Sequence, residues 1–390
     1  MKYLFIILVL VSFCQGDNKL EGGKYLFDLD IDPLETTNVY DVSEYITMVT
    51  EIEDKTIDYW TTAVRDPDTP DSSDKITKWD LLGGVSPWIH NTTTRVIENN
   101  YNYEDAPHIV YILIDDWGYN DVGYRSSYLN WTTPTVDRLA SEGVKLENYY
   151  TSNLCTPSRG ALLTGRYPSR LGFSVAYDMA ELPLDEVTLA EELKSAGYRT
   201  YMVGKWHLGM SSRARTPLYR GFDYFYGFLG GFIDYWNKTY ENYLDLRDGD
   251  NLESNPEALS SDLHSAYLFE SKAEAVIANH ATEYPDQPMF LYMASQLIHE
   301  TWAAPQVYLD RCIDGGASED EYPYCGMNVM VDEAVANLTC VLEQYGMADN
   351  TVLIIASDNG GVSSMTGSSY PFRGNKGSFY RFVAARILDC

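Results

Sequence analysis

Two adjacent pairs of oxygen-bearing side chains, Asp115–Asp116 and Asp358–Asn359, could bind a metal ion. Each pair follows an apolar run with the composition of a buried strand. Together the pairs offer carboxylate and amide oxygens, which suit a hard divalent cation such as calcium or magnesium rather than zinc. The alternative for each pair is that its side chains only cap the turn after a strand.

A second group of reactive side chains lies in the stretch Leu154–Arg166, which reads LCTPSRGALLTGR. A cysteine such as Cys155 is ordinarily a small buried apolar residue or half of a disulfide. Lys205 and His207 leave the end of another strand-like run together, so both could face one site. Taken alone, a lysine and a histidine in that position are more typical of the protein surface.

The elements that must position these residues alternate between apolar runs and amphipathic segments. The apolar runs predict buried parallel strands at His108–Ile114, Tyr198–Val203, Phe290–Ser295 and Thr351–Ala356. The amphipathic segments predict helices at Thr135–Gly143, Leu189–Ala196 and Asn328–Tyr345. This alternation predicts an α/β sandwich, with helices around a large, mostly parallel sheet. Such sheets bind ligands beyond the carboxyl ends of their strands, where the polar clusters fall.

The order Cys-x-Pro-Ser-Arg at Cys155–Arg159, followed by Leu-Thr-Gly-Arg, resembles the signature of the type I, formylglycine-dependent sulfatases. Gly197–Gly209 resembles the second signature of that family. The similarity runs from about Pro107 to Lys376 and is closest to the arylsulfatase group that includes N-acetylgalactosamine-4-sulfatase (arylsulfatase B). Further similar stretches are Arg220–Asp223, Gln296–Glu300 and Arg373–Lys376. The resemblance implies an alkaline-phosphatase-like sandwich that hydrolyses aryl or glycan sulfate monoesters.

The same resemblance implies a role for each candidate residue. Cys155 would be converted to Cα-formylglycine by the formylglycine-generating enzyme, and the hydrated aldehyde would attack sulfur. Arg159 and His207 would orient this diol, while His299 would lie near the leaving-group oxygen. The sulfate oxygens would be bound by Lys205 and Lys376. The implied ligands of one calcium ion are the modified Cys155, Asp115, Asp116, Asp358 and Asn359.

These residue types suit the implied reaction. A sulfate monoester is negatively charged and repels an attacking oxygen, so a cation, lysines and an arginine must neutralise it. The second hydroxyl of a diol, which serine and cysteine lack, lets sulfate leave without attack of water on sulfur. A histidine suits protonation of the leaving group because its pKa lies near working pH. The expected substrate is therefore a sulfated small molecule or glycan.

The whole chain is acidic, with 57 Asp+Glu, 28 Lys+Arg and a formal net charge of −29. The chain has no basic stripe that could neutralise phosphates, which excludes nucleic acid as a partner. Residues 1–16 predict a signal peptide, because Lys2 precedes the apolar run Tyr3–Phe13 and small residues follow. The alternative is a buried N-terminal strand. The run is too short to cross a bilayer, and no later membrane span is expected.

Four N-glycosylation sequons agree with entry into the secretory pathway, ending in the lysosome or the extracellular space. They begin at Asn91, Asn130, Asn237 and Asn337. Removal of Cys14 with the signal leaves an odd number of cysteines. Cys312 and Cys325 bracket a short Gly- and Asp-rich loop, so we expect these two to pair.

Three domain segments are expected. Residues 1–16 are the signal peptide, and residues 17–105 form an acidic extension that is unusually aromatic for a disordered tail. This extension either packs on the main domain or is a propeptide-like segment. Residues 106–390 are expected to be the sulfatase catalytic domain. The resemblance stops after Lys376, so we expect this domain to be truncated and to lack the family's smaller C-terminal subdomain.

Two other functions stay open. A secreted non-catalytic relative would bind sulfated glycans without turnover. A phosphatase or phosphodiesterase of the same superfamily would share the fold, but the Cys-x-Pro-Ser-Arg order disfavours it. The remaining histidines match no motif and are expected to be surface or packing residues; they are His90, His108, His264 and His280.

Overall fold

The computed structural model describes residues 106–147, 149–173, 180–362 and 367–378, together with the strand backbones at 6–9, 25–28 and 386–389. Strands β1 (Ile6–Val9) and β2 (Tyr25–Asp28) pair in antiparallel fashion. The predictions for the rest of the signal peptide, for the rest of the acidic extension, and for His90 and Asn91 fall outside the described residues.

The centre of the described chain is a nine-stranded sheet in the order β10-β9-β6-β5-β11-β3-β12-β13-β4. The five middle strands from β6 to β12 run parallel. They are β3 (His108–Ile114), β5 (Arg199–Lys205), β6 (Tyr224–Phe228), β11 (Met289–Ala294) and β12 (Thr351–Ser357). The edge strands are short and antiparallel: β4 (Val144–Lys145), β9 (Arg247–Asp248), β10 (Asn251–Leu252) and β13 (Arg386–Asp389). A separate hairpin joins β7 (Thr239–Tyr240) to β8 (Tyr243–Leu244).

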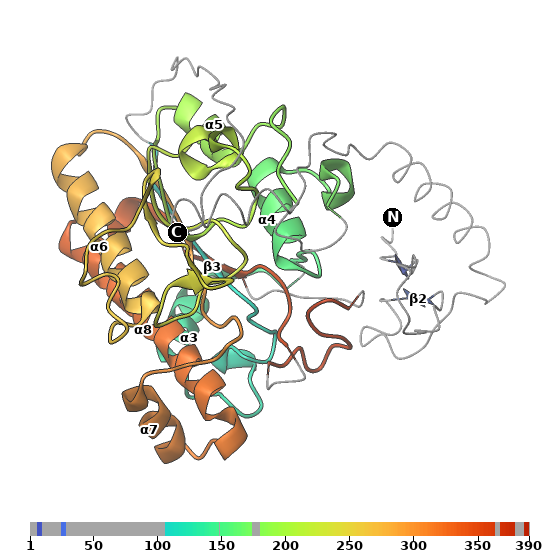
Figure 1. The fold of residues 1–390 in the computed structure, drawn as a ribbon. Coiled ribbons are helices and arrows are strands. Elements are labelled where there is room, and N and C mark those ends of the chain that lie inside the picture. The colour runs from blue at the N-terminus through green and yellow to red at the C-terminus, as the bar shows by residue number, and fades with distance from the viewer. Residues whose placement is uncertain are drawn as a thin grey trace.

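Helices cover the sheet on two sides, which explains why the middle strands are apolar throughout. In Figure 1, α3, α6 and α8 lie together on one side, while α4 and α5 lie on the other. The helices are α3 (Pro134–Glu142), α4 (Cys155–Thr164), α5 (Leu189–Ser195), α6 (Ser265–Glu283), α7 (Gln306–Asp314) and α8 (Tyr322–Gln344). Short 3-10 turns are Gly123–Arg125, Pro168–Leu171, Arg213–Arg215, Pro217–Tyr219, Glu319–Glu321 and Ala348–Asn350. The predicted α/β sandwich with a mostly parallel sheet is confirmed.

The predicted elements are present with shifted ends, and several elements were not predicted. The helix expected at Asn328 begins six residues earlier, at Tyr322, where a proline occupies the first turn. Strand β6 and helices α4, α6 and α7 had no counterpart in the prediction. Helix α6 shows why: it buries Leu268, Phe269 and Ile277 on one face, but small and polar residues blur this periodicity in the sequence.

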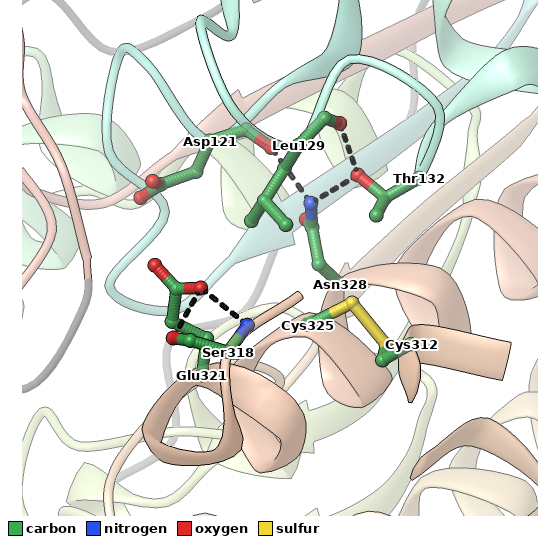
Figure 2. The surroundings of a disulfide bond; sticks show 8 residues. All are labelled: Asp121, Leu129, Thr132, Cys312, Ser318, Glu321, Cys325 and Asn328. Atoms are coloured by element: carbon green, nitrogen blue, oxygen red, sulfur yellow. Dashed lines mark hydrogen bonds between the residues drawn. A yellow bond between two sulfur atoms is a disulfide. The ribbon is translucent and has the colours of Figure 1, made fainter. Parts of the chain in front are cut away.

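One helical stretch of the described chain, Glu319–Gln344, is long and apolar enough to cross a membrane. In this structure 67% of its apolar window is buried, as in the core helix of a folded domain. Its Asn328 side chain donates hydrogen bonds to the Asp121 carbonyl at 2.7 Å and to Thr132 Oγ1 at 2.8 Å (Figure 2). Helix α8 is thereby joined to the loop that follows β3.

A disulfide between Cys312 of α7 and Cys325 of α8 confirms the predicted pairing (Figure 2). Both cysteines are buried, and their Cα atoms are 6.1 Å apart. Among the described residues, Cys155 is free and buried, and Cys340 is free and exposed. The Cys155 thiol is therefore available to react or to be modified.

Loss of this disulfide is expected to destabilise the domain. Replacing both Cys312 and Cys325 by alanine should lower the free energy of unfolding by about 3 kcal/mol, because the bond closes a short loop and restricts the unfolded chain. Urea denaturation followed by tryptophan fluorescence would measure the change. Cys340→Ala, at an exposed free cysteine, is the matched control; equal midpoints for all three proteins would show that the bond adds no stability.

Candidate active site

The candidate residues meet where neighbouring parallel strands end together. Leu113 of β3 is level with Ala294 of β11 and Ala356 of β12, and Ala294 is level with Gly204 of β5. Gly204 lets β5 pass close to β11, because its φ is +103° and a Cβ atom there would lie 2.1 Å from the Ala294 carbonyl oxygen. The chain segments after these strands therefore open onto one edge of the sheet.

Three carboxylates converge at this edge. Oxygen atoms of Asp115, Asp116 and Asp358 lie within 4.8 Å of one another, and all three side chains are buried. The backbone fixes them: Asp358 N donates to the Ile114 carbonyl at 3.1 Å, and Asp116 N donates to Asp358 Oδ1 at 3.2 Å. Asp116 has a φ of +63°, a conformation that is rare for residues other than glycine and is found at functional sites.

Asn359 completes an oxygen-rich group that fits calcium. Its Nδ2 donates to Asp116 Oδ1 at 2.7 Å, while its buried Oδ1 accepts no hydrogen bond from the described residues. A buried amide oxygen without a partner is costly, and a cation would satisfy it. Three carboxylates and this oxygen form a hard donor set that suits calcium or magnesium.

Cys155 is the first residue of α4, is 2% exposed and forms no disulfide with the cysteines that the structure describes. Its Sγ lies 3.7 Å from Asp115 Oδ1. The helix presents its N-terminal N–H groups and the positive end of its dipole here, which favours negative charge.

Arg159 lies one turn further along α4 and is completely buried. Its Nε and one terminal nitrogen donate to Asp358 Oδ2 at 3.1 and 2.8 Å, and the other donates to the Lys205 carbonyl at 3.3 Å. Burial would lower the pKa of Arg159, but Asp358 and Asp115 raise it above its ordinary value. The guanidinium thus holds a fixed positive charge beside Cys155.

Two lysines bring further positive charge. Lys205, at the end of β5, donates to Asp115 Oδ2 at 2.6 Å and is buried. Lys376 donates to Asp116 Oδ2 at 2.7 Å, and its backbone N–H is bound to the Gly361 carbonyl. Burial would raise the pKa of Asp115, but Lys205, followed by His299 and Arg159, lowers it to about 2. Asp115 is therefore ionised at neutral pH.

His299 lies in the loop after β11, and 7% of it is exposed. Its Nδ1 lies 2.5 Å from the Glu300 carbonyl, so Nδ1 carries the proton there, and Nε2 lies 3.9 Å from Asp116 Oδ2. Burial would lower the pKa of His299, but Asp115 raises it above its ordinary value.

His207 is buried two residues after β5, with a φ of +53°.

The structure thus connects nine of the ten predicted site residues in one network of contacts. They are Asp115, Asp116, Cys155, Arg159, Lys205, His299, Asp358, Asn359 and Lys376. His207 is buried close to Lys205 in the chain, and its predicted contact with the group at Cys155 stays a prediction. Sequence reasoning missed Phe232 and Tyr235, which contact His299 from the loop after β6. The one sequence feature that could have indicated these two residues is the position of Phe232 directly after Gly230–Gly231.

The histidines that match no motif pack in the domain where the structure describes them, as expected. His264 and His280 are buried, and burial lowers the pKa of each to about 4. His280 contacts the Tyr201 hydroxyl and the Gln287 carbonyl. His108 accepts a hydrogen bond from Met289 N. None of these three contacts the network around Cys155 in the described part of the chain.

Comparisons with known proteins identify the family. A family model described as Sulfatase matches residues 107–381. Arylsulfatase J of Mus musculus is 39% identical over 282 residues, covering 70% of this chain and 46% of that protein. Arylsulfatase A of Homo sapiens is 33% identical over 302 residues, covering 70% and 56%. The crystal structure of Ps i-CgsB in complex with k-i-k-neocarrahexaose shares 27% identity and a TM-score of 0.65, covering 73% of this chain and 65% of that one.

The family model spans most of the described chain, including every residue of the network around Cys155. The chain spans about half the length of the curated relatives it matches. The overall fold agrees with the solved structures that it resembles, including one with a TM-score of 0.65. The chain therefore belongs to the sulfatase family and has its alkaline-phosphatase-like fold.

Proposed function

We propose that this chain hydrolyses sulfate monoesters of the aryl or glycan type, with a formylglycine made from Cys155 and one calcium ion. The observation that carries the proposal is a buried, unpaired cysteine at the N-terminus of α4, next to Asp115 and within a network of cationic side chains. A sulfatase needs its nucleophile at such a place, because the substrate is an anion that must be neutralised before attack.

Calcium would be held by Asp115, Asp116, Asp358 and Asn359, together with the group at position 155. The ion would add positive charge beside the sulfate oxygens. The buried, unpartnered Oδ1 of Asn359 supports this assignment. The size of the ion is not fixed by the donor set, and calcium is preferred over magnesium on the family resemblance.

Formylglycine would supply, as its hydrate, one hydroxyl for attack on sulfur and a second that allows sulfate to leave again. Arg159, fixed by Asp358, would orient this group from the same helix. Lys205 and Lys376 would bind sulfate oxygens, since both ammonium groups already contact the carboxylates of the site. His299 would give a proton from Nε2 to the leaving oxygen, and His207 would hydrogen-bond the group at position 155.

The further assignments rest on the family resemblance and on the composition of the sequence. We propose membership of the arylsulfatase group that includes N-acetylgalactosamine-4-sulfatase, maturation by the formylglycine-generating enzyme, and passage through the secretory pathway to the lysosome or the extracellular space. The described sequon asparagines agree with glycosylation, because all of them are exposed; they are Asn130, Asn237 and Asn337. The division into a signal peptide (1–16), an extension (17–105) and a catalytic domain (106–390) is part of this proposal.

The experiment that tests the proposal is a peptide mass across Leu154–Arg166, after expression of the whole chain in a eukaryotic secretory host. We expect loss of the thiol and the mass of an aldehyde or its hydrate at position 155. Rates on matched sulfate and phosphate esters would then separate a sulfatase from a phosphatase. An unmodified Cys155 in soluble, folded protein would overturn the active-enzyme proposal and favour a non-catalytic relative that binds sulfated glycans.

A further inference from the structure

The loop after β6 holds the His299 segment from two directions. Phe232 stacks on the imidazole, with ring centroids 5.5 Å apart and planes 13° from parallel. The Tyr235 hydroxyl lies 2.9 Å from the His299 carbonyl and 2.9 Å from the Gln296 carbonyl, so its proton is shared between the two. One aromatic side chain thus faces the ring, and another binds the backbone that carries it.

This loop is itself fixed. Gly230 N donates to Asp245 Oδ2 at 2.7 Å, and Leu229 N donates to the same carboxylate. Tyr235 is 1% exposed and stacks on His264 at 4.8 Å. The loop can therefore serve as a rigid support for a neighbouring segment.

The imidazole of His299 needs such support. Its Nδ1 contacts the carbonyl of the next residue, Glu300, in the same loop, and the ring also contacts the Cys155 thiol, the group that the proposed function converts. Nε2 lies 3.9 Å from Asp116 Oδ2, too far for a hydrogen bond. Apart from the contact with Cys155, the direction of Nε2 depends on the packing of the ring and on the position of the backbone, and these are the two features that Phe232 and Tyr235 contact.

We infer that Tyr235 and Phe232 are positioning residues that aim His299 Nε2 at the leaving-group oxygen of the substrate. The inference rests on the proposed function, in which His299 protonates that oxygen. Phe232 is 38% exposed, so its open face is also available to the ring of a bound aryl or sugar sulfate. The pair acts on the step in which the ester bond breaks, and not on the binding of sulfate by the lysines.

The leaving group provides the test. A nitrophenolate leaves with little protonation, whereas a sugar alkoxide requires it, so a misplaced His299 should slow the two substrates unequally. Tyr235→Phe removes only the hydroxyl. We expect it to lower kcat on a monosaccharide sulfate by roughly 10-fold or more, with about a 3-fold or smaller loss on 4-nitrophenyl sulfate and little change in KM. Phe232→Ala should show the same unequal loss.

Tyr226→Phe is the matched control, because it deletes another buried tyrosine hydroxyl, which donates to Glu253 at 2.7 Å. It should keep the wild-type ratio of the two rates even if it lowers the melting temperature. An equal loss on both substrates for Tyr235→Phe, or no loss, would overturn the inference. Such a result would leave the proposed sulfatase activity of the wild-type chain intact.

An activity-independent readout separates the two proposals further. NMR spectra of protein labelled at histidine Cε1 would show the His299 resonance, which the variant His299→Gln assigns. This resonance should shift in Phe232→Ala, because the ring current of Phe232 is lost. It should shift or broaden in Tyr235→Phe. The resonances of His108 and His280 should stay in place. If the wild-type chain turned over no sulfate ester, the proposed function would fail, while these shifts would still decide whether the loop positions His299. An unchanged His299 resonance in both variants would refute the positioning role.

Discussion

Replacement of Cys155 by alanine is expected to lower the rate of sulfate-ester hydrolysis by roughly 10⁴-fold or more. The reason is that alanine cannot be oxidised to an aldehyde, so the chain loses its only proposed nucleophile. The fold should persist, because Cys155 is a small buried residue and its thiol hydrogen bonds, with Asp115 at 3.7 Å and with His299, are weak. Initial rates on 4-nitrophenyl sulfate, together with the melting temperature, would measure both effects.

Cys340→Ala is the matched control, because Cys340 is a free cysteine on the exposed face of α8. It should retain full activity and stability. Wild-type rates in Cys155→Ala would place the nucleophile elsewhere. A wild-type chain and a Cys155→Ala variant that bind a sulfated glycan equally, with turnover by neither, would instead favour the non-catalytic relative.

The location of the site could be predicted because its residues follow regular elements. Asp115 and Asp358 each come directly after an apolar run, and parallel strands end at a common edge. Asn359 was found by the same reasoning, whereas Lys205 was assigned to the site on the family resemblance, because a lysine at a strand end is by itself more typical of the surface. The pairing of Cys312 with Cys325 could be predicted because few residues separate the two cysteines and so few alternatives exist.

The parts that could not be predicted depend on contacts between distant segments. Phe232 and Tyr235 contact His299 because β6 lies two strands from β11 in the sheet. The order of strands in a sheet cannot be predicted from the local periodicity of the sequence. The stretch Tyr224–Phe228 contains Gly227, which weakens the signal of a strand. In the structure a Cβ at Gly227 would lie 1.9 Å from the Gly204 carbonyl oxygen, so the residue reflects a close approach of two strands.

The sequence also does not show which cationic side chains neutralise the buried carboxylates. Asp115, Asp116 and Asp358 are almost completely buried, and without partners such carboxylates would become protonated. The described structure supplies Arg159 and Lys205 for this purpose. The same cations that prepare the site for a sulfate therefore also offset the cost of burying these carboxylates.

Asp358→Asn is expected to remove the stabilisation of the chain by calcium. In the wild-type protein, calcium at about 100 times its Kd should add about 2.7 kcal/mol to the free energy of unfolding, and excess EDTA should reverse this. The variant should show almost no calcium-dependent change in melting temperature, because it loses one anionic ligand and the charge that Arg159 contacts at 2.8 Å. It should also be about 3 kcal/mol less stable without calcium, since the buried guanidinium loses its main partner.

Asp332→Asn separates the loss of a metal ligand from the loss of any buried carboxylate. Asp332 is 5% exposed, and its oxygens accept hydrogen bonds from Thr135 N at 3.1 Å and Val136 N at 2.8 Å at the start of α3. This variant should melt at a lower temperature than the wild type, yet keep the full upward shift with calcium. A full shift in Asp358→Asn as well would exclude Asp358 as a ligand. No shift in the wild-type chain would exclude a stabilising calcium ion at this edge of the sheet, whatever the activity of the enzyme.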